Sequence, residues 1–320
     1  MVTGAGGFIG RALVSKLVES GAQLRAFVRY NSRGDRGLLR LLPPEVLESV
    51  ETIAGDLRDA DAVSRAAAGV DVIFHLGALI AIPYSYKHPV EVVQTNVLGT
   101  LNVLQACRTH SCRLVHTSTS EVYGTALRVP IDEQHPLQGQ SPYSASKIGA
   151  DQLVESYVRA FDVQAVTVRP FNTYGPGQSA RAVIPTIITQ ALTQDVIQLG
   201  NLEARRDFTY LDDTVAGFIR AAQVPKLEGE TINLGYGAEI SIGELAELVV
   251  ALVDRPVRIA VDDQRLRPNK SEVMRLLSDN SKAKRLLGWQ PKTDIRTGLS
   301  LTIDWIRQHL DMYRVGRYEL

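Results

Sequence analysis

The chain has 320 residues, of which 45% are hydrophobic and 22% are charged, and its 35 Lys and Arg residues balance 35 Asp and Glu residues. A net charge of zero excludes a general attraction to nucleic acid or to an anionic membrane, so any anion-binding site must be local. The two cysteines are too few for a disulfide framework, and no apolar run approaches the roughly 18 residues of a membrane span. We therefore expect a cytoplasmic protein with no nucleic-acid or membrane partner.

The chain begins with a short apolar strand that runs into a glycine-rich loop, Gly4-x-x-Gly7-x-x-Gly10. Glycines at this spacing permit a tight turn and a close approach of the backbone to a pyrophosphate, and the N–H groups of the helix start face the phosphates. The alternative interpretation is that the glycines only form a tight turn. The strand–loop–helix context required for a dinucleotide site is present, however, and favours that site. The shortness of the strand leaves open whether residues precede Met1. We expect a dinucleotide to bind on Gly4, Gly7, Phe8, Ile9 and Gly10.

Short apolar runs alternate with amphipathic stretches up to about residue 170. The predicted strands are Leu24–Val28, Val70–Leu76, Arg113–Thr117 and Val163–Val168, and the predicted helices are Arg11–Ser20, Val90–Thr109 and Tyr143–Phe161. This alternation is typical of βαβ units with a parallel sheet covered on both faces, and the apolar runs are too short for buried helices. The sequence therefore predicts an α/β fold in which residues 1–170 form a Rossmann-type, doubly wound parallel sheet.

The end of the second strand usually carries an acidic residue that binds the adenosine ribose of NAD. Here the strand ends in Val28-Arg29 with Arg33 close by, and no carboxylate is present. Arginines at this place suit the 2′-phosphate of NADP, so the sequence favours NADP over NAD. The alternative is that both arginines are solvated and that NAD binds without the carboxylate.

The regular alternation of predicted strands and helices ends after residue 170. Ala182–Thr193 is predicted to be helical, Ser241 and Glu244 have capping-box spacing before another apolar run, and Gly288 is a predicted helix stop before Trp289. We expect residues 171–320 to form a smaller C-terminal α/β domain that binds the substrate, with residues 207–222 packing back on the first domain.

A tyrosine and a lysine lie one helical turn apart near the middle of the chain. Ser141 suits the N-cap of the predicted helix and Pro142 its first turn, which places Tyr143 and Lys147 on one face. A nearby ammonium is expected to lower the pKa of the phenol, so that it can exchange a proton with a substrate hydroxyl. A tyrosine and a lysine at this spacing are common on exposed helices, so the pair alone does not indicate a catalytic site.

Together, Gly4-x-x-Gly7-x-x-Gly10 and Tyr143-x-x-x-Lys147 resemble the extended short-chain dehydrogenase/reductase family over nearly the whole chain. The resemblance implies a sugar-nucleotide substrate held beneath a smaller domain. It also implies a homodimer that pairs the helices 90–109 and 143–161 across a two-fold axis. It adds the dinucleotide-binding positions Asp56, Leu57, Leu76, Ala78 and Asn96.

The run Ser118-Thr119-Ser120-Glu121-Val122-Tyr123-Gly124 follows a predicted strand and indicates the subfamily. Its Thr-Ser-Glu triplet resembles that of GDP-mannose 4,6-dehydratases. Together with Ala78–Tyr86 and Arg169–Pro176, it is most similar to N-acetylglucosamine nucleotide 4,6-dehydratases of legionaminic-acid-type pathways. UDP-glucuronate decarboxylases carry a similar triplet, so that activity stays open.

The resemblance also places Asn172, Arg206 and Arg267 at the pyrophosphate of the sugar nucleotide, where forked guanidinium groups suit phosphate oxygens. Taken singly, each arginine is more often a solvated surface residue. The histidines show no metal-ligand spacing, and we expect no metal site.

The implied activity is that of an NDP-hexose 4,6-dehydratase acting on GDP- or UDP-N-acetylglucosamine to give a 4-keto-6-deoxy sugar. The resemblance assigns proton transfer at the 4-hydroxyl to Tyr143, a hydrogen bond to that oxygen to Thr119, and the nicotinamide ribose to Lys147. It assigns removal of the C5 proton to Glu121. Ser120 or Glu121 would help the 6-hydroxyl to leave as water. The alternatives are an NDP-sugar 4-epimerase, a UDP-glucuronate decarboxylase and a non-catalytic dinucleotide sensor; a sensor would need none of these groups.

Overall fold

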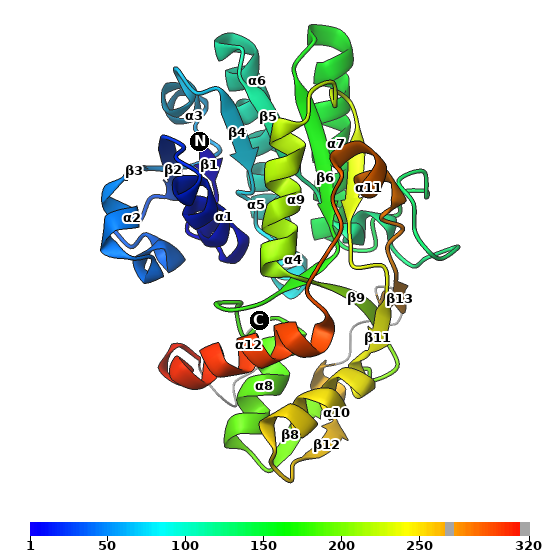
Figure 1. Ribbon diagram of the computed structural model, residues 1–320. Helices are drawn as coiled ribbons and strands as arrows, with labels where there is room; N and C mark the ends of the chain where they lie inside the picture. The colour runs from blue at the N-terminus through cyan, green and yellow to red at the C-terminus, as the bar shows by residue number, and fades with distance from the viewer. Residues whose placement is uncertain (266–271, 314–320) are drawn as a thin grey trace.

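A seven-stranded sheet forms the centre of the larger of two lobes in the computed structural model, which describes residues 1–265 and 272–313 (Figure 1). The strand order is β10-β6-β5-β4-β1-β2-β3, and every neighbouring pair is parallel. The order reverses between β1 and β4, which is where an open α/β sheet forms its ligand crevice. The strands are β1 (Val2–Thr3), β2 (Leu24–Arg29), β3 (Val50–Gly55), β4 (Val72–His75), β5 (Arg113–Thr117), β6 (Ala165–Pro170) and β10 (Thr231–Leu234). The predicted Rossmann-type fold is confirmed.

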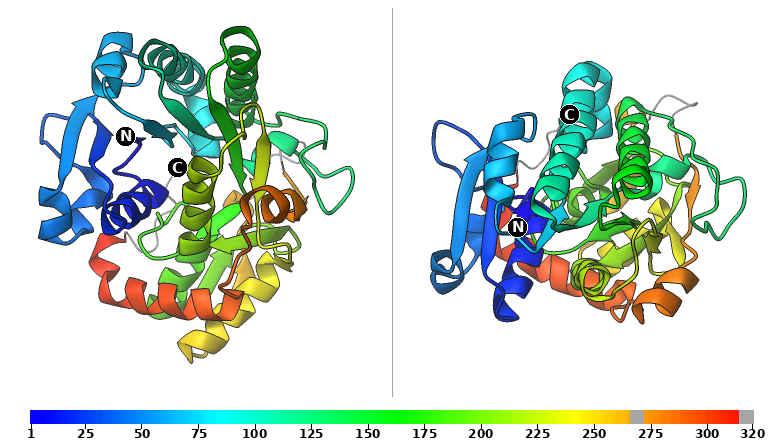
Figure 2. Two further views of the ribbon diagram at one scale, coloured as in Figure 1. Left: turned by 45° about the horizontal axis from the view of Figure 1, so that its top comes forward. Right: turned by 90° about the horizontal axis from the view of Figure 1, so that it is seen from above.

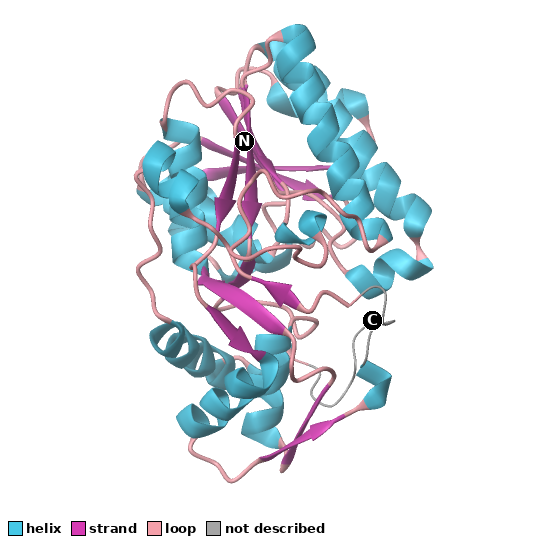
Figure 3. Cartoon of the chain, turned by 90° about the vertical axis from the view of Figure 1, so that its right-hand side faces the viewer, coloured by secondary structure: helices cyan, strands magenta, loops and turns pink. Residues whose placement is uncertain are grey.

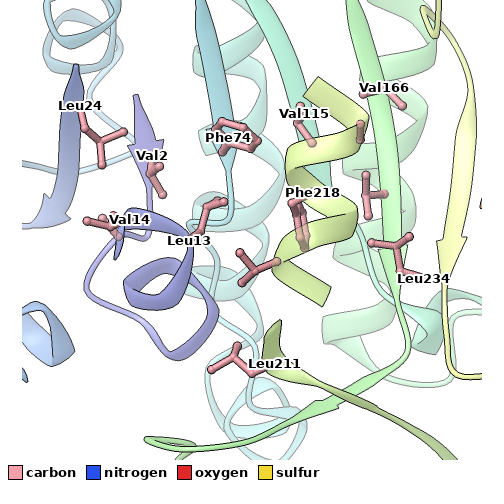
Figure 4. Packing of buried hydrophobic residues seen from close by; sticks show 14 of the residues in the cluster. Val2, Leu13, Val14, Leu24, Phe74, Val115, Val166, Leu211, Phe218 and Leu234 are labelled. Atoms are coloured by element: carbon pink, nitrogen blue, oxygen red, sulfur yellow. The ribbon is translucent and has the colours of Figure 1, made fainter. Parts of the chain in front are cut away.

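Helices cover both faces of this sheet (Figure 2). Figure 4 shows Leu13 and Val14 of one helix and Phe218 of another packed against Phe74 and Val115 of the sheet. One face carries α1 (Phe8–Glu19), α9 (Leu211–Gln223) and α11 (Ser281–Leu287), and the other carries α3 (Ala60–Ala67), α6 (Gly99–His110) and α7 (Pro142–Phe161).

The predicted helix over 90–109 exists, but it is built from three segments. It runs through α5 (Pro89–Val93), a π-helical segment η2 (Gln94–Leu98) and α6. The predicted strand over 163–168 is displaced, because α7 ends in a left-handed residue at Asp162 and β6 begins only at Ala165. Shorter elements connect the main ones: η1 (Gly37–Leu41), α2 (Pro44–Glu48), α4 (Ile82–Lys87) and η3 (Ser120–Tyr123).

The second lobe lies beyond the carboxyl ends of the strands (Figure 3). Its core joins three helices to a four-stranded sheet and a two-stranded parallel sheet. The elements are β7 (Asn172–Tyr174), α8 (Val183–Thr193), β8 (Val196–Leu199), β9 (Arg205–Tyr210), β11 (Glu239–Ser241), α10 (Ile242–Val253), β12 (Arg258–Val261), η4 (Asp263–Arg265), β13 (Arg275–Leu276), α12 (Ile295–Gln308) and η6 (Leu310–Met312).

The chain crosses between the lobes more than once. Helix α9, strand β10 and helix α11 all belong to the first lobe, although they follow residue 170. The capping box of Ser241 and Glu244 and the helix stop at Gly288 are observed as predicted. Within the described residues, no helix is both long and apolar enough to cross a membrane.

Candidate active site

The glycine loop between β1 and α1 is a cradle that side chains could not occupy. Gly4 has φ +67°, and a Cβ there would lie 2.8 Å from the backbone of Gly77. A Cβ on Gly10 would collide with the carbonyl oxygen of Gly4, and Gly7 caps helix α1 and donates to that same carbonyl at 2.9 Å. Phe8 and Ile9 form the first turn, with side chains packed on the core. The N–H groups of this turn suit the pyrophosphate of a dinucleotide, so these residues fit the expected cofactor.

Asp56 and Leu57 lie at the end of β3, on the predicted adenine side of the crevice. The Asp56 carboxylate binds the Arg58 guanidinium through two contacts of 3.0 and 2.6 Å, and this hydrogen-bonded pair lowers the pKa of Asp56. Leu57 is buried, and a Cβ on either Gly77 or Gly99 would press on its side chain. Leu57 therefore forms part of the packed floor of the crevice.

Asn96 acts on the cofactor loop through a neighbouring backbone segment. Its amide donates to the Leu79 carbonyl at 3.0 Å and to the Ser146 hydroxyl at 2.9 Å, and it accepts from the Leu79 N–H at 2.8 Å. Leu76 and Ala78 lie in the segment that leaves β4 just before Leu79. Asn96 thus holds this loop against helix α7.

The two arginines predicted to bind a 2′-phosphate differ in their surroundings. Arg29, the last residue of β2, lies 3.3 Å from the Glu91 carboxylate of α5. Arg33 is exposed in the following turn. Arg29 therefore has an internal counter-ion that the sequence pattern did not indicate.

Helix α7 begins with the predicted cap and buries its functional pair. The Ser141 hydroxyl accepts from the Ser144 N–H at 3.1 Å, the Ser144 hydroxyl accepts from the Ser141 N–H at 3.0 Å, and Pro142 occupies the first turn. Tyr143 and Lys147 follow one turn apart, and their exposed fractions are only 7% and 4%. The helix start therefore fixes both groups in a dry environment.

Burial controls the titration of both groups. It raises the pKa of Tyr143; a hydrogen bond from Thr119 opposes this shift and the charge of Glu121 reinforces it. The expectation that Lys147 lowers the pKa of the phenol is therefore wrong for this structure, because desolvation outweighs other influences. Burial lowers the pKa of Lys147 from 10.5 to about 8, partly offset by the charge of Asp151.

The Thr119-Ser120-Glu121 triplet leaves β5 on the 3₁₀ turn η3. Thr119 caps this turn, and its hydroxyl accepts from the Glu121 N–H at 3.2 Å. Ser120 is buried. Strand alternation ends here, so Glu121 reaches the site from a helical turn rather than from an extended strand.

A cavity of about 370 Å³ brings Glu121 together with Asn172 and Arg206. Asn172 donates to the Asp207 carbonyl at 3.3 Å, and the guanidinium of Arg206 lies 3.4 Å from the Glu272 carboxylate. Arg267 lies outside the described residues. Three charged groups of the cavity wall were not predicted: Arg181, Arg265 and Glu272. The Arg206–Glu272 contact joins segments 66 residues apart, so no local pattern could have indicated it.

A buried ionic cluster lies behind Lys147. Asp151, one turn further along α7, lies 2.9 Å from Arg169 and accepts from the Ser118 hydroxyl at 2.7 Å and from the His116 ring at 3.1 Å. Burial acts to raise the pKa of Asp151, but the hydrogen bond from His116 and the charge of Arg169 outweigh it and the pKa is lowered. The spacing of Tyr143, Lys147 and Asp151 on one helix face could have indicated this carboxylate.

Among the described residues, no group of three or more His, Cys, Asp or Glu side chains could hold a metal ion.

Comparison with known proteins gives the family and supports the fold. Residues 1–302 match the family model described as GDP-mannose 4,6 dehydratase. The chain is 31% identical to a UDP-glucose 4-epimerase of Mycolicibacterium smegmatis (96% of this chain, 98% of the other) and 32% identical to UDP-glucuronic acid decarboxylase 4 of Arabidopsis thaliana (97% and 69%). It superposes on the dTDP-glucose 4,6-dehydratase of Streptomyces venezuelae, solved with NAD bound, with a TM-score of 0.86, 29% identity and 98% coverage of both chains.

Proposed function

The chain belongs to the GDP-mannose 4,6-dehydratase family, and from that premise we propose that it removes water from a nucleotide-linked hexose to give the 4-keto-6-deoxy sugar. The observation that supports this proposal most is the position of Glu121. Its carboxylate lines the same cavity as Asn172 and Arg206, and its charge acts on the phenol of Tyr143. An epimerase that moves hydride only at C4 has no use for a carboxylate base at the neighbouring carbon.

In the proposed reaction, Tyr143 accepts the proton of the sugar's 4-hydroxyl while Thr119 donates a hydrogen bond to that oxygen. The bound dinucleotide supplies a hydride acceptor for C4, a hydride donor for C6 and, when oxidised, a positive ring charge that favours the Tyr143 phenolate. The 4-ketone acidifies the C5 proton, which Glu121 removes; once hydride has been added at C6, C5 regains a proton that has exchanged with solvent. Ser120 or Glu121 gives a proton to the departing 6-hydroxyl, and Lys147 holds the nicotinamide ribose.

The proposed substrate is GDP- or UDP-N-acetylglucosamine, and the proposed cofactor is a tightly bound NAD or NADP. Arg206 faces the cavity beside Glu121, as a group that holds the substrate's pyrophosphate must. Asn172 and Arg267 are proposed to share this role. The cofactor would lie on the glycine cradle, with Asp56 at the adenine.

We further propose that the protein is a homodimer. Val90 and Val93 of α5, Leu98 of η2 and Phe161 of α7 are large apolar side chains with 40% or more of their surface exposed. Helices α5 and α7 pack side by side, so this apolar surface suits a second copy of the chain. Light scattering should give twice the chain mass, and Val93→Glu should give the monomer.

Replacing Glu121 by Gln tests the proposed reaction. The variant should still oxidise C4, so that reduced cofactor and a 4-ketohexose accumulate, while elimination falls roughly 10²–10⁴-fold because the general base is lost. Absorbance of the reduced nicotinamide and mass spectrometry of the sugar nucleotide measure the two steps separately. Full turnover by this variant would refute the role of Glu121, and a product with its carboxylate lost would favour the decarboxylase.

A further inference from the structure

Four charged side chains near the expected adenosine end of the crevice form two pairs of opposite charge. Arg29 ends β2 and faces Glu91 of α5, and Arg58 is bound by Asp56 just beyond β3. The two pairs act on one another, because the charge of Arg29 lowers the pKa of Asp56 and the charge of Arg58 lowers that of Glu91. These four charges sum to zero before any ligand arrives, and Arg33 lies exposed in the turn that follows β2.

Glu91 is held in place by a second contact. The Tyr84 hydroxyl of α4 donates to one carboxylate oxygen at 2.5 Å, and Arg29 lies 3.3 Å from the other. The hydrogen bond from Tyr84 is the main reason why the pKa of Glu91 is lowered, so the carboxylate is ionised at neutral pH. A fixed negative charge on α5 thus lies against Arg29.

This charge bears on the choice between the two dinucleotides. NADP differs from NAD by a 2′-phosphate, a group that carries about −1.5 to −2 charge near pH 7. At this corner the phosphate would meet Glu91 as a like charge and would have to draw Arg29 away from it, whereas the 2′-hydroxyl of NAD carries no charge. Arg29 is largely exposed and Glu91 is partly buried, so the pair itself contributes little stability and the repulsion from Glu91 is the larger influence.

We propose that Glu91 is a specificity-determining residue that neutralises Arg29 and makes the crevice select NAD over NADP. This inference rests on the proposed function, in that it requires a dinucleotide on the glycine cradle. It reverses the preference for NADP that the strand-end arginines favour when the sequence is considered alone.

The test is Glu91→Gln, which removes the charge but keeps the size of the side chain and an acceptor for Tyr84. Protein is equilibrated with equal concentrations of NAD and NADP, and the retained dinucleotides are released by denaturation and quantified by chromatography. The wild-type chain should retain mainly NAD. The variant should raise the ratio of NADP to NAD about tenfold, as expected for removing one unit charge near a phosphate.

Two further variants locate the effect. Glu51→Gln also removes a carboxylate paired with a strand arginine, Arg25 at 2.8 Å, but at the opposite end of β2 and β3, and it should leave the ratio unchanged. Adding Arg29→Ala to Glu91→Gln should abolish the gain. A ratio that Glu91→Gln does not change, or that Glu51→Gln changes equally, would overturn the inference. Retention of neither dinucleotide by the wild-type chain would overturn the proposed function and the inference with it.

Discussion

Two arginine–carboxylate pairs lie near the candidate active site, and their surroundings differ. The Asp151–Arg169 pair supports helix α7, which carries Tyr143 and Lys147, and only 4% and 6% of the two side chains are exposed. His116 and Ser118 also donate to Asp151, and Arg169 donates to Tyr123. The Glu272–Arg206 pair forms part of the cavity wall, at 3.4 Å and with 16% and 9% exposed. The first pair is almost wholly buried and we expect it to support the fold, whereas the second lies at the cavity where we propose that a phosphate replaces the Glu272 carboxylate. The proposed site therefore combines a buried support with a replaceable ligand contact.

The largest effect is expected from Asp151→Asn. The substitution leaves Arg169 buried without its counter-ion, and breaking a buried pair costs about 3–5 kcal/mol of unfolding free energy. Urea unfolding measures this loss. Glu272→Gln is the matched control and should cost less, since Arg206 keeps its hydrogen bond to the Arg205 carbonyl and borders the cavity. Equal losses in the two variants would remove the distinction between the pairs.

The next effect concerns Lys147 and depends on pH. Folding lowers the pKa of Lys147 from 10.5 to about 8, so below pH 8 the protein buries an ammonium group at a cost of about 3 kcal/mol. Between pH 8 and 10.5 the unfolded chain binds more protons than the native one, so stability from this group rises with pH. Lys147→Met should therefore be more stable than the wild type at pH 7, and the difference should vanish by pH 10.5.

Urea unfolding of both proteins across this pH range measures the difference. Lys16→Met is the control, because Lys16 is exposed and its hydrogen bond to Glu19 raises its pKa, so no gain at pH 7 is expected. A difference between Lys147→Met and wild type that does not change with pH would contradict the account of a buried ammonium.

A smaller effect is expected at the replaceable pair. Arg206→Ala should weaken binding of free UDP or GDP by about 1.5–3 kcal/mol, because charge-assisted bonds to phosphate are lost. We expect the same of Arg267→Ala. Glu272→Gln should not weaken binding, since its carboxylate competes for Arg206. Calorimetry measures all three, and unchanged affinity in both arginine variants would show that the pyrophosphate binds elsewhere.

The first lobe was predictable because its signals are local. The glycine loop, the cap at Ser141 and the alternating apolar runs each depend on a few adjacent residues, and they lie in the elements expected apart from the strand over 163–168, which begins only at Ala165. Strands β3 and β10 were not predicted. β10 pairs with β6 from a distant part of the chain, and only the tertiary fold brings it there.

The candidate site was predictable where one element carries the pattern and not where two elements meet. Tyr143 and Lys147 share a helix face, so their spacing alone placed them together. The pairing of Arg29 with Glu91 and the burial that raises the pKa of Tyr143 both depend on packing between segments far apart in sequence. Local spacing carries no information about such desolvation.

The central claim is that Glu121 breaks the C5–H bond after C4 has been oxidised. The most direct test is turnover of the wild-type enzyme in deuterated water with GDP- and UDP-N-acetylglucosamine, followed by mass spectrometry and nuclear magnetic resonance of the product. The account predicts a 4-keto-6-deoxy sugar that carries deuterium at C5. A product that keeps its 6-hydroxyl group and its original C5 hydrogen would contradict it and would identify the enzyme as an epimerase.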